Sequence, residues 1–165
     1  MTAKYLTAHK LIYLNASTTI SQLCPYLKGL NATVMTNSID NASALMMDNL
    51  PNVILLGGYL NKKNHYTSSL TSLKEIDQYE FDIAVIGTSA VNKNGVFVVN
   101  HSKTVILLAE EYKFKEDRSS HYKVMDCKQA DILITDNKLD PYYRKYFKKN
   151  IKVREVLEEE CIKSK

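Results

Sequence analysis

Three consecutive hydroxyl residues stand shortly after the apolar segment Leu11–Leu14: Ser17, Thr18 and Thr19. The apolar spacing after them predicts a helix over residues 19–28, kinked at Pro25, which cannot donate a helical hydrogen bond. The first amides of a helix lack partners within it and therefore attract anions. The hydroxyl groups can cap this helix or join its amides in holding a phosphate, and this stretch alone leaves both interpretations open.

Strand and helix patterns alternate along the chain. Apolar runs predict strands at residues 11–14, 32–36, 52–56, 81–86, 104–109, 122–125, 132–135 and 151–156, and helical spacing predicts helices at 2–10, 19–28, 39–50, 68–78 and 141–149. Residues 53–56 of the run at 52–56 are all apolar, which is typical of a strand buried on both faces, and a polar loop is expected at residues 61–67. Asn94-Gly95 is typical of a hairpin turn. The sequence predicts an α/β fold of three layers, with a mostly parallel sheet, helices on both faces and an antiparallel hairpin near residues 82–99.

Small or hydroxyl residues stand where the first predicted strands end. The carboxyl ends of parallel strands share one edge of a sheet, and ligands bind there in such folds. Ser38 can cap the helix predicted at 39–50, and Gly29 stands where a C′ glycine belongs after the helix predicted at 19–28. Capping alone does not explain this recurrence, because the glycine pair opens no helix directly. A G-x-G-x-x-G fingerprint for dinucleotides is absent. We therefore predict a ligand site formed by Asn15, Ser17, Thr18, Thr19, Thr36, Asn37, Ser38, Gly57 and Gly58.

Length and composition bound the class of protein. The 165 residues fit one domain, and 45% apolar with 24% charged residues is ordinary for a soluble globular protein. No apolar run approaches the ~20 residues that span a bilayer and no signal peptide precedes the first strand, so we expect a cytoplasmic protein that does not enter a membrane. The three cysteines are widely spaced, and we expect no disulfide framework, no metal and no cofactor.

A basic run lies near the end of the chain, within residues 144–154, and tyrosines are mixed with it. This mixture can bind nucleic acid, but the aromatic spacing also fits the buried face of a terminal helix. Acidic residues follow at 155 and 158–160, so we favour a solvated helix face. We expect no specific DNA binding by this chain alone, and any affinity for DNA should be non-specific and sensitive to salt.

Taken in order, these stretches resemble the C-terminal sensor domain of DeoR-family transcriptional repressors. Ser17-Thr18-Thr19 stands at the end of the segment where that family has the five-residue motif aspartate, any residue, glycine, threonine, threonine. Residues 34–38 resemble its valine-threonine-asparagine-serine strand end, and residues 53–58 match its leucine-glycine-glycine. Residues 81–87, 108–114 and 134–136 follow in the expected order. The resemblance covers about residues 11–156, and the fold is shared with ribose-5-phosphate isomerase, glucosamine-6-phosphate deaminase and CoA transferases.

The resemblance implies that residues 1–165 form a single effector-sensing domain of a transcriptional regulator, without a DNA-binding domain. Its expected partner is a phosphorylated sugar or a related small anionic metabolite. Ser17–Thr19 would hold the phosphate, Thr36 and Asn37 would contact sugar or phosphate, and the glycine pair would let the backbone approach the ligand. Lys113 would supply charge, and Glu110 stands where the family has aspartate.

Two departures from the family pattern bear on catalysis. The family's first acid is Asn15 here, and its glycine is replaced by a residue with a side chain. An isomerase or deaminase needs a carboxylate base, which Asn15 cannot provide. A CoA transferase needs a nucleophilic glutamate, and Glu110 and Glu111 are better read as loop charges. We therefore expect no enzyme activity and rank second a remnant or oligomerisation domain with a degenerate site.

A third departure concerns residues 100–103. The family places a helix between the strands that we predict at 96–99 and 104–108, and four residues are too few for such a crossover. The absence of this helix predicts an uncovered sheet face on which the side chains of Val105 and Leu107 are exposed to water. Exposed apolar surface of this kind usually becomes an interface. We therefore predict a homo-oligomer in which a second subunit covers residues 96–108.

Overall fold

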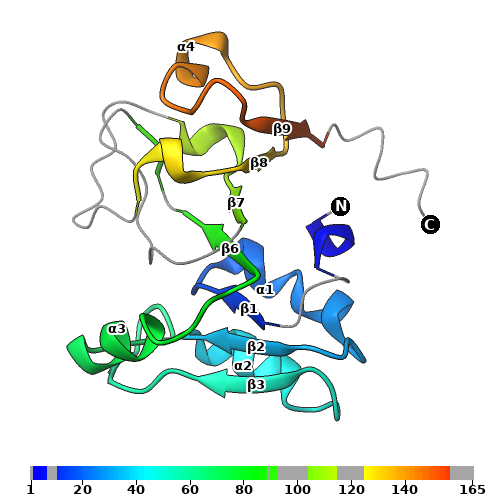
Figure 1. Cartoon of the computed structure of the whole chain (residues 1–165), viewed down its shortest axis with the longest axis vertical. Coiled ribbons are helices and arrows are strands. Elements are labelled where there is room, and N and C mark those ends of the chain that lie inside the picture. Colours follow the sequence, from blue (N-terminus) through cyan, green and yellow to red (C-terminus); the bar gives the residue numbers. More distant parts are fainter. Residues whose placement is uncertain (1, 7–10, 89, 93–103, 115–124, 157–165) are drawn as a thin grey trace. The chain divides into compact units, whose positions relative to one another are not determined.

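The computed structural model describes residues 2–6, 11–88, 90–92, 104–114 and 125–156 (Figure 1). Its strands are β1 (Leu11–Leu14), β2 (Thr33–Thr36), β3 (Asn52–Leu55), β4 (Tyr59–Asn61), β5 (Tyr66–Ser68), β6 (Ile83–Gly87), β7 (Val105–Leu108), β8 (Ile132–Thr135) and β9 (Lys152–Glu155). Within the described residues, seven of them form a parallel sheet in the order β3-β2-β1-β6-β7-β8-β9, and β4 and β5 form a separate antiparallel hairpin. The predicted α/β class with a mostly parallel sheet is confirmed.

The chain divides into two compact units, Met1–Gly87 with Val99–Thr104, and Thr88–Val98 with Val105–Lys165. The helical elements of the first unit are η1 (Thr2–Tyr5), α1 (Thr18–Ser21), η2 (Cys24–Leu27), α2 (Ile39–Leu45) and α3 (Leu70–Ile76), where η marks a 3-10 turn. Those of the second are η3 (Glu111–Lys113), η4 (Cys127–Gln129) and α4 (Pro141–Arg144). In the part of the chain that the structure describes, no helix has the length and apolar character needed to cross a bilayer.

Strand β1 lies between β2 and β6 in the first unit. Ile12 stands in register with Val34 of β2 and with Ile83 of β6, and all three side chains are fully buried. Strand β2 pairs in parallel with β3 on its other side. Because the strands are parallel, the turns that follow them share one edge of the sheet, and this edge carries the predicted site residues of the first unit.

The helices of the first unit are shorter than predicted. The helix expected over residues 19–28 is replaced by α1 and η2, and Pro25 stands in the first turn of η2, where its missing N–H leaves no bond unmade. Gly29 follows with a φ of 75°, as its predicted position after a helical turn requires. Helix α2 ends at Leu45 rather than at residue 50, since Met46 and Met47 are exposed and provide no buried face for another turn.

The prediction that residues 52–56 form a strand buried on both faces is wrong. Among the strands that the structure describes, β3 lies at the edge of the sheet and pairs with β2 alone, and Leu55 is 44% exposed. An apolar run marks a strand but does not show whether a second element covers it. The polar stretch expected to be a loop at residues 61–67 is largely the hairpin of β4 and β5, which turns through His65 at a φ of 49°.

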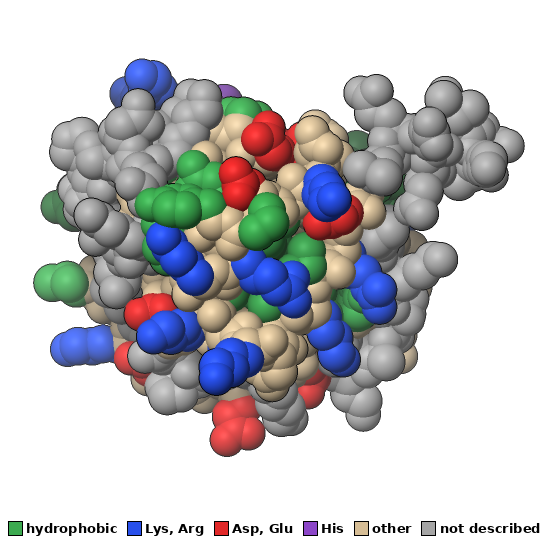
Figure 2. All heavy atoms as spheres, turned by 90° about the horizontal axis from the view of Figure 1, so that it is seen from above, with side chains coloured by type: hydrophobic (Ala, Val, Ile, Leu, Met, Phe, Trp, Pro, Cys, Tyr) green, Lys and Arg blue, Asp and Glu red, His purple; other side chains and the backbone are tan. Residues whose placement is uncertain are grey.

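In the second unit, β8 pairs in parallel with β7 and β9. The strand predicted at 132–135 is confirmed with the same bounds, and those at 104–109 and 151–156 are confirmed with shorter ones. The helix expected over 141–149 ends at Arg144. Figure 2 shows the face on the side of α4, where Lys and Arg side chains are spread among hydrophobic ones. Residues 122–124 of the strand predicted at 122–125 and residues 93–99 of the hairpin predicted near 82–99 lie outside the described residues.

The predicted exposure of the β7 side chains is also wrong. Leu107 is 0% exposed, its neighbours Ile106 and Leu108 are buried, and Val105 is half-buried. The strand predicted at 96–99 and the connecting residues 100–103 lie outside the described residues. Because these side chains are already covered within the chain, β7 does not need a second subunit to bury them, and the oligomeric state stays a prediction.

Candidate functional site

The side chain of Asn15 ties the end of β1 to the end of β6. Its Nδ2 donates to the carbonyl oxygen of Gly87 at 2.9 Å, and its Oδ1 accepts from the amide of Gly87 at 2.9 Å. A carboxylate at this position could accept the second bond but could not donate the first. The amide therefore has a structural role that the acid of the family pattern could not fill in the same way.

Gly87 also makes room for Ser17. A Cβ atom on Gly87 would overlap the Oγ and Cβ atoms of Ser17, so the absence of a side chain lets the hydroxyl turn lie against the end of β6. Ser17 is the N-cap residue of α1 in extended conformation, and among the described residues its side chain makes no capping hydrogen bond. Its carbonyl oxygen accepts from the amide of Ser21 at 3.0 Å. The capping interpretation of the Ser17 hydroxyl thus loses support, and Thr18 beside it is exposed.

Asn41 of α2 is a site residue that the sequence analysis missed. It is 0% exposed, and its Nδ2 donates to the carbonyl oxygen of Asn15 at 3.1 Å and to Oγ1 of Thr36 at 3.2 Å. Its Oδ1 accepts from Oγ of Ser21 at 2.9 Å. One amide side chain therefore joins the ends of β1 and β2 to α1. Its position four residues before the buried Leu45 places it on the inner face of α2, and this spacing was the available signal.

The predicted residues after β2 make internal hydrogen bonds. Ser38 caps α2 by accepting from the amide of Asn41 at 3.2 Å, which confirms its predicted role as a cap. Thr36 is fully buried, and its Oγ1 accepts from the amide of Ser38 at 3.1 Å. Asn37 accepts from the amide of Ala16 at 3.1 Å through Oδ1. These side chains hold the turn after β1 in place from the neighbouring strand end.

The turn after β2 also contacts the segment that contains the glycine pair. Nδ2 of Asn37 donates to the carbonyl oxygen of Thr67 at 3.2 Å, and Oγ1 of Thr67 donates to that of Leu56 at 2.5 Å. Gly58 has a φ of 133°, and a Cβ there would stand 2.5 Å from the carbonyl oxygen of Ser68, so the hairpin requires this glycine. At Gly57 no other described atom lies within 4 Å of a Cβ position, which leaves its surface open to approach.

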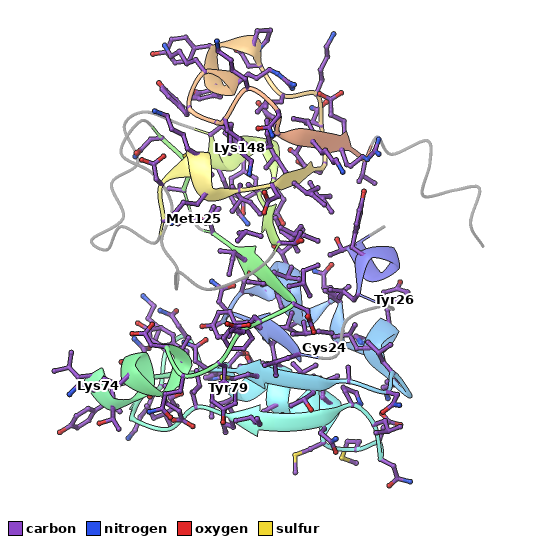
Figure 3. All side chains as sticks on the ribbon, viewed as in Figure 1. Cys24, Tyr26, Lys74, Tyr79, Met125 and Lys148 are labelled. Carbon is purple, nitrogen blue, oxygen red and sulfur yellow. The ribbon has the colours of Figure 1, made fainter. Side chains whose placement is uncertain are left out.

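Burial sets the charge state of the one thiol in contact with this network. Cys24 lies in η2 of the first unit (Figure 3), and its Sγ donates to Oδ1 of Asn41 at 3.7 Å. Desolvation raises the pKa of the Cys24 thiol to about 11, so it is neutral at physiological pH. The described residues contain no group of three or more His, Cys, Asp or Glu side chains that could hold a metal ion.

The two charged residues of the predicted site belong to the second unit. Lys113 is 5% exposed, and its Nζ pairs with Oε2 of Glu110 at 2.5 Å. The same ammonium lies 5.5 Å from the centre of the Tyr112 ring. The charge of Lys113 is therefore already balanced by a carboxylate within its own unit. The structure groups Asn15, Ser17, Thr36, Asn37 and Ser38 around Asn41 in the first unit.

Comparisons with known proteins point to one family. A family model described as the DeoR C terminal sensor domain matches residues 1–137. The chain is 28% identical over 137 residues to the HTH-type transcriptional repressor GlcR of Bacillus subtilis, a match that covers 76% of this chain and 52% of the relative. It is 23% identical over 141 residues to a putative aga operon transcriptional repressor of Escherichia coli O157:H7, a match that covers 78% of this chain and 52% of the relative. The chain thus spans about half the length of these curated relatives.

Proposed function

This chain belongs to the family of DeoR C-terminal sensor domains, and we propose that it is the effector-sensing part of a transcriptional regulator that binds a phosphorylated sugar or a related small anionic metabolite. The family match confirms the resemblance drawn from the strand-end motifs. The relatives are transcriptional regulators, which is consistent with a sensor rather than an enzyme. We also keep as a proposal that residues 1–165 act as one sensor domain.

The hydroxyl turn at the end of β1 is the observation that supports this proposal. Ser17 makes no capping bond among the described residues, and Thr18 is exposed beside it. Hydroxyl and amide donors can each donate to a phosphate oxygen, and the turn offers both. Because Asn15 and Asn41 fix the backbone around the turn, a ligand would meet donors that are already arranged.

The other predicted residues take different parts in the proposal. Thr36, Asn37 and Ser38 would act by holding the turn, because their side chains are already hydrogen-bonded within the unit. Gly57 would let the ligand approach the backbone. Thr19, Glu110 and Lys113 are kept as proposed ligand residues on the family resemblance alone.

A thermal-shift assay with a panel of phosphosugars tests the proposal. A ligand at ~100 times its Kd stabilises the fold by about 2.7 kcal/mol, or roughly 5–10 °C for a chain of this size. The shift should be lost in Ser17→Ala and kept in Thr71→Ala, which removes an exposed hydroxyl from α3 of the same unit. A broad panel that gives no shift with the wild-type chain would contradict the proposal.

The second candidate is an oligomerisation domain with a degenerate ligand site. Exposed apolar side chains on and beside the edge strand β3 favour it, since such surface is often covered by a partner. They include Leu55 of β3, Tyr59 and Leu60 of β4, and Leu70 of α3. In this case a second copy of the chain would cover them. Light scattering at micromolar concentration should then show more than a monomer, and Leu60→Lys should shift the mass toward the monomer.

A further inference from the structure

The segment from residue 138 to β9 is strongly basic. Residues 138–155 contain seven Lys or Arg and two acidic residues, a net charge of +5 in a chain whose total is +4. Most of these cations are on the surface, and we call them the α4–β9 surface. The exposed members are Lys138, Arg144, Lys145, Lys149, Lys152 and Arg154. Figure 2 shows Lys and Arg side chains distributed over the face on this side of the second unit.

The two acidic residues of the segment accept hydrogen bonds from backbone amides. Asp140 caps α4 by accepting from the amide of Tyr142 at 2.8 Å, and Oε1 of Glu155 accepts from the amide of Leu139 at 3.1 Å. The bond between Leu139 and Glu155 also fixes the start of α4 to the end of β9. These carboxylates therefore serve to hold the segment together.

The cations fall into two groups. Lys148 is half-buried and forms an ion pair with Asp131, so its charge is balanced inside the unit. Arg144, Lys149 and Lys152 are exposed and form no ion pair with any described residue. Their charges face solvent, and no described carboxylate balances them. Exposed, unpaired cations favour the binding of a polyanion, because each cation that contacts the polyanion releases a counterion condensed on it.

Aromatic packing gives these charges a fixed support. Phe147 is buried and packs with Phe114, whose ring also lies 5.5 Å from that of Tyr143. Tyr143 of α4 and Phe147, which follows the helix, therefore anchor this segment against Phe114, whereas Tyr142 of the predicted buried face is exposed. On the outer side, Nζ of Lys145 lies 3.6 Å from the centre of the Tyr142 ring, and the tyrosine is 46% exposed. The cation–π contact holds the lysine at the surface.

We propose that the α4–β9 surface binds the phosphate backbone of double-stranded DNA without reading its sequence. Arg144, Lys149 and Lys152 form no ion pair with any described residue, so their charges can pair with the regularly spaced phosphates of a duplex. DNA is favoured over an acidic protein because the family match places this chain among regulators of transcription. This inference is independent of effector binding. It extends the expectation that any DNA affinity of the chain is non-specific by assigning that affinity to named residues.

Fluorescence anisotropy with two unrelated 30-base-pair duplexes tests the proposal on the whole chain. Contacts from Arg144, Lys145, Lys149 and Lys152 predict a slope of about −3.6 for log Kobs against log salt, or a fall of about 150-fold between 50 and 200 mM. In the triple variant R144Q/K149Q/K152Q the slope should become shallower by about 2.7, to about −0.9. This variant should also bind DNA at least tenfold more weakly at 50 mM salt. Both duplexes should behave alike.

The matched control is the triple variant K62Q/K63Q/K74Q, which changes three exposed lysines of the first unit. Lys74 on α3 projects from that unit (Figure 3), and either triple lowers the formal net charge from +4 to +1. The control should keep the wild-type slope. All six substituted side chains are exposed, so both variants should melt within about 3 °C of wild type.

Four results would overturn the proposal. They are no wild-type binding at 50 mM salt, equal loss of slope in both triple variants, a tenfold preference for one duplex, and competition by polyglutamate as effective as that by DNA of equal charge. The last result would assign the surface to an acidic protein instead. Loss of DNA binding with an intact phosphosugar shift would leave the sensor function standing.

Discussion

Replacing Asn15 by aspartate tests whether its amide clamps β1 to β6. Asn15→Asp restores the acid of the family pattern and exchanges the amide nitrogen for an oxygen. The carboxylate can still accept from the amide of Gly87, but it loses the 2.9 Å bond donated to the Gly87 carbonyl oxygen. The new carboxylate oxygen and the carbonyl oxygen of Gly87, both negatively polarised, then face each other in a half-buried position.

The expected cost follows from those two changes. Losing a partly buried hydrogen bond and leaving the carbonyl unpaired costs about 1–3 kcal/mol. A central value of about 2 kcal/mol lowers Tm by roughly 4–8 °C in a chain of this length. The measurement is urea denaturation at pH 7, read as the free energy of unfolding relative to wild type. Asn64→Asp, in the exposed β4–β5 turn, makes the same change in charge and should cost less than about 0.5 kcal/mol.

The pH dependence of the Asn15→Asp variant provides a sign test. When the introduced carboxyl group is protonated it can donate to the Gly87 carbonyl, so folding should favour the protonated form and raise the pKa of this carboxyl above its unfolded value of about 3.9. The deficit relative to wild type should then be smallest near pH 4 and should grow as the pH rises to 7. A variant as stable as wild type at pH 7, or one whose deficit grows on acidification, would refute the clamp.

Further substitutions probe the same network. Gly87→Ala should lower the free energy of unfolding by about 1–3 kcal/mol in urea, since its methyl group overlaps Ser17, and it should also abolish any phosphosugar shift. Asn41→Ala should cost about 2–4 kcal/mol in the same assay, because it removes the donor to the buried Thr36 hydroxyl and to the carbonyl oxygen of Asn15. Cys24, read by peptide mass spectrometry, should resist iodoacetamide at pH 8 in the folded chain and react in 6 M guanidinium; because its pKa is raised to about 11, folded-state reaction should grow only as the pH approaches that value.

The sequence was informative where one local rule decides the structure. The bounds of β8 were predicted because its apolar run is short and flanked by polar residues, and Ser38 was recognised as a cap because its side chain needs only the amides of the next turn. The positive φ of Gly29 followed in the same way from its place after a helical turn. These features depend on residues within a few positions of each other.

The errors occurred where the outcome depends on distant parts of the chain. The exposure of β3 depends on its being the last strand of the sheet, and the burial of Leu107 depends on what packs against β7. Asn41 has an ordinary helical position, and its role appears only when the ends of two strands and a helix surround it. Donor and acceptor pairing across such distances has no local signature in one sequence.

The side chains gathered at the strand ends of the first unit have a common property, which is that none of them ionises near neutral pH. Asparagine, serine, threonine and glycine supply every contact described there, and the nearby Cys24 is kept protonated. A site built from such groups keeps the same charge from about pH 5 to about pH 9. A phosphate monoester loses its second proton near pH ~6. Any pH dependence of recognition at this turn would therefore report the ionisation of the metabolite and not that of the protein.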